Sequence, residues 1–130
     1  MFTAKQIKEA HGKVRTGADF PSFIKEIKSM GVNYYETFVK DGHTDYFGAN
    51  DHQVSTAAKF QTLAISEEAN TNAFVSNLKA HQQGNTDYMT FCRDCAQSGI
   101  EKWAVCTDTM TCTYFDRSGI KVLTEDIPHI

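Results

Sequence analysis

Residues 19–31 read DFPSFIKEIKSMG, and residues 87–99 read DYMTFCRDCAQSG. Each stretch begins with an aspartate, ends with a glycine, and carries apolar or thiol side chains at positions i, i+3, i+4 and i+7: Phe20, Phe23, Ile24 and Ile27, then Tyr88, Phe91, Cys92 and Cys95. These spacings place the side chains on one face of a helix. Aspartate is a common N-cap, and glycine ends many helices. Both stretches therefore predict the same amphipathic helix.

The two helices belong to a longer repeat, in which a constant offset carries Asp19 onto Asp87 and Gly31 onto Gly99. Upstream, a helix around Ile7 matches one around Val75, and downstream each half has a β-rich run. Residues 1–62 and 69–130 align without a gap and share eight identities, at Thr3, Asp19, Phe23, Gly31, Tyr46, Phe47, Val54 and Thr56. We interpret residues 1–130 as one domain with an internal pseudo-repeat. A chance likeness of two ordinary α+β stretches is the alternative.

Each half reads helix, helix, strand, strand, strand, and a further strand at residues 60–66 is expected to join the halves. The links between these elements are short. Short links favour an antiparallel sheet with the helices packed on one face. The predicted fold class is therefore α+β.

Residues 40–43, Lys-Asp-Gly-His, carry the strongest turn signal of the chain. Asp-Gly favours a two-residue type I′ hairpin loop, and such a loop fixes the strand register. This register places a mostly apolar set on one face: Tyr35, Thr37, Val39, Thr44 and Tyr46, matched by Trp103, Val105, Thr107, Cys112 and Tyr114. We assign that face to the core.

The opposite face mixes aromatic and charged side chains, which is the composition of many small-molecule sites. We predict a ligand-binding site formed by Tyr34, Glu36, Phe38, His43, Asp45 and Phe47. The aromatic rings would stack on a ligand and the polar groups would orient it. Packing of the other half, the joining strand or a second copy against this face is the alternative.

The same face contains the best candidates for an enzyme, with Glu36 as the acid or base and His43 or Asp45 as its partner. No serine or histidine has a partner at a spacing typical of a nucleophile and its base, so no catalytic residue is assigned. The glycines form no phosphate-binding loop, and the sequence indicates no cofactor.

Four cysteines lie between Cys92 and Cys112, and the Cys92/Cys95 spacing raises the question of a zinc site. Cys92 and Cys95 match Ile24 and Ile27 in the repeat, and the predicted hairpin puts Cys106 and Cys112 on opposite faces. We therefore interpret these residues as mainly buried thiols and assign no metal, with zinc or redox chemistry as the alternative. His43, Asp45, Asp51 and His52 form a second cluster of ligand types, typical of a solvated loop.

The charge balance and the hydropathy argue against two classes of binding partner, nucleic acids and membranes. Thirteen lysines and arginines against sixteen acidic residues give a net charge of −3 without a basic run, which argues against nucleic-acid binding. No signal segment and no apolar stretch of membrane-spanning length is found, which predicts a cytoplasmic protein without membrane association. A small molecule and a second copy of the chain, as a homodimer, are the candidate partners.

The sequence also resembles a bacterial family known as domain of unknown function 1398, some of whose members are labelled phage envelope protein. The resemblance is carried by Phe23-Ile24, Gly31-Val32, Tyr35, Phe91-Cys92, Gly99-Ile100, Trp103, Tyr114 and Ile127-Pro128. These motifs are structural, so they imply a family and no reaction. The label implies a phage or prophage connection and a structural role as an alternative. The specific function is unknown. The sequence itself favours a non-catalytic role in ligand binding or protein interaction.

Overall fold

The computed structural model describes residues 2–14 and 19–127; Pro128, from the last of the motifs above, lies outside this part. Four helices and six strands follow in the predicted order, helix, helix, strand, strand, strand in each half. The first half contains α1 (Ala4–His11), α2 (Phe20–Ser29), β1 (Val32–Phe38), β2 (Thr44–Gly48) and β3 (Gln53–Ser55). The second contains α3 (Thr71–Gln82), α4 (Tyr88–Gln97), β4 (Ile100–Cys106), β5 (Thr111–Asp116) and β6 (Lys121–Asp126).

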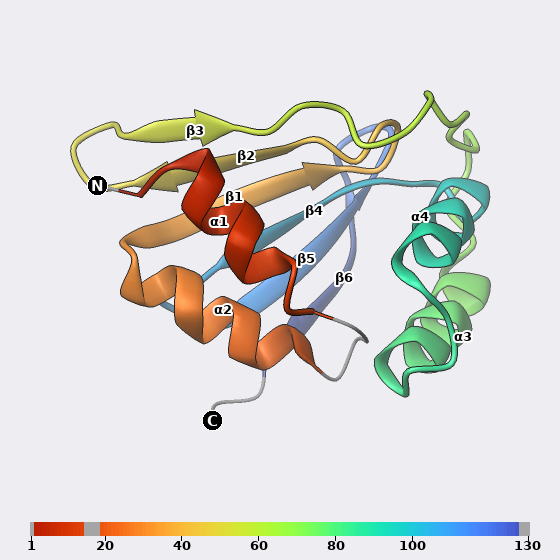
Figure 1. The fold of residues 1–130 in the computed structure, drawn as a ribbon. Coiled ribbons are helices and arrows are strands. Elements are labelled where there is room, and N and C mark those ends of the chain that lie inside the picture. The colour runs from red at the N-terminus through yellow and green to blue at the C-terminus, as the bar shows by residue number, and fades with distance from the viewer. Residues whose placement is uncertain (1, 15–18, 128–130) are drawn as a thin grey trace.

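All six strands form one antiparallel sheet in the order β3-β2-β1-β4-β5-β6. The helices pack as two pairs, α1 with α2 and α3 with α4. Figure 1 shows the two pairs standing apart, with α1 and α2 in front of the sheet and α3 and α4 beside its second half. The α+β prediction, with an antiparallel sheet and helices on one face, is confirmed.

The centre of the sheet relates the two halves. In the β1–β4 ladder, Glu36 lies directly opposite Ala104, which is its equivalent in the repeat. On either side of this pair, Tyr35 faces Val105 and Thr37 faces Trp103. Tyr35 corresponds to Trp103 in the repeat, and Thr37 corresponds to Val105, so each flanking pair is the repeat equivalent of the other. An approximate twofold axis therefore passes between Glu36 and Ala104.

The helix starts differ between the halves. Asp87 caps α4, because its Oδ1 accepts a hydrogen bond of 2.8 Å from the Thr90 N–H. Asp19 occupies the corresponding position before α2, but its side chain makes no capping hydrogen bond and its backbone is already helical. The prediction of a side-chain cap at Asp19 is therefore wrong. Pro21 lies in the first turn of α2, where its missing N–H costs no helical hydrogen bond.

The first hairpin has a longer loop than predicted. Thr37 pairs with Thr44, and the Phe38 N–H donates to the His43 carbonyl at 2.9 Å, so residues 39–42 form a four-residue loop. The register differs by two residues from the one a two-residue loop would give. Because side chains alternate with a period of two, this shift leaves the faces unchanged. Tyr35, Thr37 and Tyr46 are buried on the helix side as predicted.

The strand predicted at residues 60–66 is not formed. Residues 57–70 run as an irregular linker from β3 to α3. Their backbone donors go to separate partners: the Leu63 N–H to the Lys40 carbonyl at 2.6 Å, and the Ser66 N–H to the Ala96 carbonyl at 2.9 Å. A strand needs a neighbouring strand with which to form a continuous series of hydrogen bonds, and a turn and a helix end do not provide one. The β-like composition of these residues is therefore not enough to form a strand here.

A single hydrophobic core lies between the helices and the sheet. Both halves contribute to it, through fully buried side chains such as Ile24, Ile27, Phe74, Ile100 and Val105. None of the helices in the described part of the chain has the length and apolar character that a membrane crossing requires.

Candidate functional site

The residues of the sequence-predicted site lie together on the sheet face that points away from the helices. Tyr34 pairs with Phe47 and Glu36 with Asp45 across β1 and β2. Phe38 stacks on His43, with ring centroids 4.5 Å apart and planes 7° from parallel. All six predicted residues, Tyr34, Glu36, Phe38, His43, Asp45 and Phe47, are half-buried.

Two polar groups on this face, those of Glu36 and His43, are already paired with residues outside the predicted set. Glu36 Oε2 accepts a hydrogen bond of 2.6 Å from Lys102 Nζ. His43 Nδ1 lies 2.5 Å from Asp41 Oδ1. Burial, followed by the Glu36 carboxylate, raises the pKa of Tyr34 to about 12. The acid–base pair considered from the sequence, Glu36 with His43 or Asp45, is therefore not formed by hydrogen bonding in the described part of the chain.

The second predicted cluster consists of His43, Asp45, Asp51 and His52, and its two histidines contact different partners. His52 Nε2 lies 2.8 Å from the Phe2 carbonyl oxygen, and the two rings meet edge to face at 4.4 Å. Among residues 2–14 and 19–127, no three histidine, cysteine or acidic side chains lie close enough together to hold a metal ion.

The cysteines take the positions predicted for them. Cys92, Cys95 and Cys112 are buried on the helix side of the sheet, whereas Cys106 is half-buried on the other face. Burial raises the pKa of Cys92 to about 11 and that of Cys112 to about 12, and it also raises the pKa of Cys95. These three thiols are therefore protonated at neutral pH, and a protonated thiol is a weak nucleophile and a weak metal ligand.

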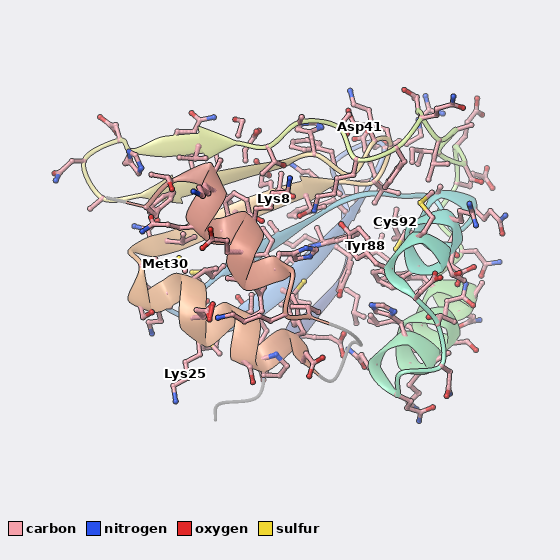
Figure 2. All side chains as sticks on the ribbon, in the orientation of Figure 1. Lys8, Lys25, Met30, Asp41, Tyr88 and Cys92 are labelled. Atoms are coloured by element: carbon pink, nitrogen blue, oxygen red, sulfur yellow. The ribbon has the colours of Figure 1, made fainter. Side chains whose placement is uncertain are left out.

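A cavity of about 500 Å³ lies between the two helix pairs, over the helix side of the sheet. Its floor is formed by strands of both halves, with Tyr35, Tyr46, Trp103 and Tyr114. Its walls are formed mainly by α1, α2, α3 and α4, with His11, Phe20, Phe23, Leu78, His81, Tyr88 and Phe91. Figure 2 shows Tyr88 and Cys92 on the side of α4 that faces the first helix pair.

Many residues that line the cavity are related in pairs by the approximate twofold axis. Seven pairs of lining residues occupy equivalent positions in the repeat, and in four of them both members are aromatic: Phe20 and Tyr88, Phe23 and Phe91, Tyr35 and Trp103, and Tyr46 and Tyr114. The cavity therefore lies where the two halves meet and takes an aromatic ring from each half at these four pairs of positions.

Two histidines extend this aromatic lining. His11 meets Phe23 and Tyr88 edge to face, with ring centroids 5.3 and 5.7 Å away, so it links α1 to both flanking helices. His81 stacks on Phe91 at 4.4 Å, and its Nδ1 lies 3.1 Å from the Thr86 carbonyl oxygen.

Most titratable groups in the lining are uncharged at neutral pH. Burial, helped by the nearby Lys59, lowers the pKa of His11 to about 4, and burial also lowers that of His81. Burial raises the pKa of Tyr46 to about 12. The interior is consequently a neutral aromatic surface with a few hydroxyl and imidazole groups, whereas the charged residues Lys59, Glu125 and Asp126 belong to more exposed segments.

The sequence does not predict this site. The helix-facing strand residues are predicted to belong to the core, and most of them are indeed buried. The repeat did place matched aromatic rings on facing helices and strands, and that was the available signal. A packed core uses the same residue types, so the pattern could not show that a volume between the rings is left unfilled.

Comparison with known families agrees with the motifs. The sequence profile of a family described as "Protein of unknown function (DUF1398)" matches residues 8–126. The chain belongs to this family. The family has no assigned activity, and its profile begins in the second half of α1 and covers α2, α3, α4 and all six strands of the described chain. No curated protein matches the sequence.

Proposed function

We propose that this chain is a non-catalytic binding domain that takes a small, flat, largely apolar molecule into the cavity between its two helix pairs. The observation that carries the proposal is the aromatic lining of a cavity of about 500 Å³. Ligand pockets are typically about 300 to 1,000 Å³ and mostly apolar, with few polar groups. Flat rings of a ligand would find aromatic partners on the floor and on both walls.

The few polar groups in the lining fit this role. His11 is neutral at neutral pH, and neither ring nitrogen has a hydrogen-bond partner in the described part of the chain. A neutral imidazole offers one donor and one acceptor. By contrast, the Thr37 and Thr44 hydroxyls on the floor are 2.8 Å apart and satisfy each other. His11 is therefore the group best placed to orient a ligand through a hydrogen bond.

The proposal is tested by isothermal titration calorimetry of the full chain with 2-naphthylmethanol, an uncharged bicyclic probe. We expect saturable binding to the wild type. Tyr88→Leu should weaken binding about five- to tenfold, since an aromatic pair is worth roughly 1 kcal/mol beyond its buried area. Tyr34→Leu is the matched variant on the opposite sheet face and should leave the affinity unchanged.

Circular dichroism of both variants checks that they fold like the wild type. Absence of binding to the wild type contradicts the proposal. Loss of binding in Tyr34→Leu with unchanged binding in Tyr88→Leu also contradicts it, and would place the site on the face predicted from the sequence.

The remaining expectations come from the sequence and stay proposals. They are a homodimer, a cytoplasmic location, and a bacterial origin with a prophage connection. The half-buried aromatic side chains of Tyr34, Phe38 and Phe47 support the homodimer, because an uncovered aromatic sheet face favours association.

A further inference from the structure

Lys59 lies at the cavity with its backbone held in place. It follows β3 in the linker, and its N–H donates to the Asp41 carbonyl at 2.8 Å. Its side chain is exposed over part of its surface, and Nζ lies 5.3 Å from the centroid of the Tyr88 ring. The ammonium group is therefore at the cavity rim, beside an aromatic wall.

Lys59 has no acidic partner in the described part of the chain. Lys13 pairs with Glu26 at 2.9 Å and Lys102 with Glu36 at 2.6 Å, but no carboxylate of residues 2–14 and 19–127 lies within ion-pair distance of Lys59. Its neighbours are the neutral His11 imidazole and the protonated Cys92 thiol. Partial burial lowers the pKa of Lys59, as expected for a cation that loses water without gaining an anion.

The acidic residues of the lining belong to a different part of the cavity. Glu125 and Asp126 lie at the end of β6, and Glu125 Oε1 accepts a hydrogen bond of 3.1 Å from Gln82 Nε2. Glu125 acts electrostatically on Cys112 and Tyr114, whereas Lys59 acts on His11 and Cys92. The cavity thus has a positive side and a negative side, with aromatic rings between them.

We propose that the ligand of this cavity is an aromatic carboxylate whose anionic group pairs with Lys59 while its ring lies among the aromatic walls. This inference rests on the proposed function. A carboxylate at Lys59 would supply the missing counter-charge. Glu125 and Asp126 would repel a carboxylate from the opposite side, so the two charged sides together fix the ligand's orientation.

The test compares three probes of nearly equal shape by calorimetry at neutral pH: 2-naphthoate, 2-naphthylmethanol and 2-naphthylmethylamine. We expect 2-naphthoate to bind the wild type about tenfold more tightly than the alcohol, the size expected of a charge-assisted hydrogen bond. Lys59→Met should remove this preference, so that 2-naphthoate binds the variant no more tightly than the alcohol does. Lys79→Met removes an exposed lysine of α3 and should keep the preference.

Each other outcome overturns the inference. If the alcohol binds and 2-naphthoate binds no better, the cavity function stands and the carboxylate class is wrong. If the amine binds best, Glu125 and Asp126 select the ligand instead. If Lys59→Met keeps the preference, or Lys79→Met loses it, Lys59 is not the anion partner. If none of the three probes binds, the proposed function fails as well.

Discussion

His11 carries its imidazole into the cavity, against the rings of Phe23 and Tyr88. Burial is the larger cause and Lys59 the smaller cause of its pKa falling from 6.5 to about 4. Between these two pH values the unfolded chain binds a proton at His11 that the folded chain does not. The part of the unfolding free energy that depends on a neutral His11 is therefore fully present above pH 6.5 and is lost as the pH falls from 6.5 to about 4.

We expect His11→Phe to make the protein less sensitive to mild acid. Between pH 7 and pH 5, the wild type should lose about 1 kcal/mol of unfolding free energy through His11, after allowance for its partial exposure to solvent. The variant lacks the titrating group and should lose that much less. Urea unfolding of both proteins at the two pH values gives the comparison. An equal loss in both proteins would show that His11 does not titrate differently on folding.

At the scale of the elements, Gly31 and Gly99 end equivalent helices but have different surroundings. Both have positive φ values, +107° and +81°, which disfavour any residue with a Cβ. A Cβ at Gly31 would lie 3.9 Å from the nearest heavy atom, in the Phe2 side chain. A Cβ at Gly99 would lie 2.5 Å from the Glu68 carbonyl oxygen and 2.8 Å from Ala69 Cα, because the linker 57–70 crosses there.

Gly99→Ala should therefore destabilise the protein more than Gly31→Ala, although the two sites are repeat equivalents. We expect about 1 kcal/mol for Gly31→Ala, from backbone strain alone. Gly99→Ala should cost about 2 to 4 kcal/mol, because the clash with linker backbone adds to the strain. Chemical denaturation of the two variants measures both values. Equal costs would mean that the linker moves away from Gly99 without resistance.

At the scale of the whole molecule, pairing of β1 with β4 joins the halves into one sheet over one core. Neither half can keep its helices packed if this central ladder separates, because core residues of both halves contact one another. We therefore expect a single cooperative unfolding transition. Fluorescence of Trp103, the only tryptophan, reports on the second half, whereas far-ultraviolet circular dichroism reports on both. Separate midpoints from the two signals would show halves that unfold independently.

Much of the architecture follows from local sequence. The helix faces around Phe23 and Phe91, the glycine ends at Gly31 and Gly99, and the alternation in β1 are set by helical and strand periodicity, which nearby residues determine. The same periodicity assigned the sheet faces correctly even though the hairpin register was off by two residues. It also brought together the six residues of the sequence-predicted site, whose role in binding stays a prediction.

Other features depend on contacts between distant segments. The linker at 57–70 is irregular because its donors meet a turn and a helix end, and Asp19 and Asp87 differ in capping despite equivalent positions. The cavity is the clearest case. Its rings, such as Tyr35 and Phe91, have the composition of a core, and periodicity correctly turns them inward. The tertiary structure alone holds the two helix pairs far enough apart to leave a volume between them, because that spacing depends on how whole elements pack across the sheet.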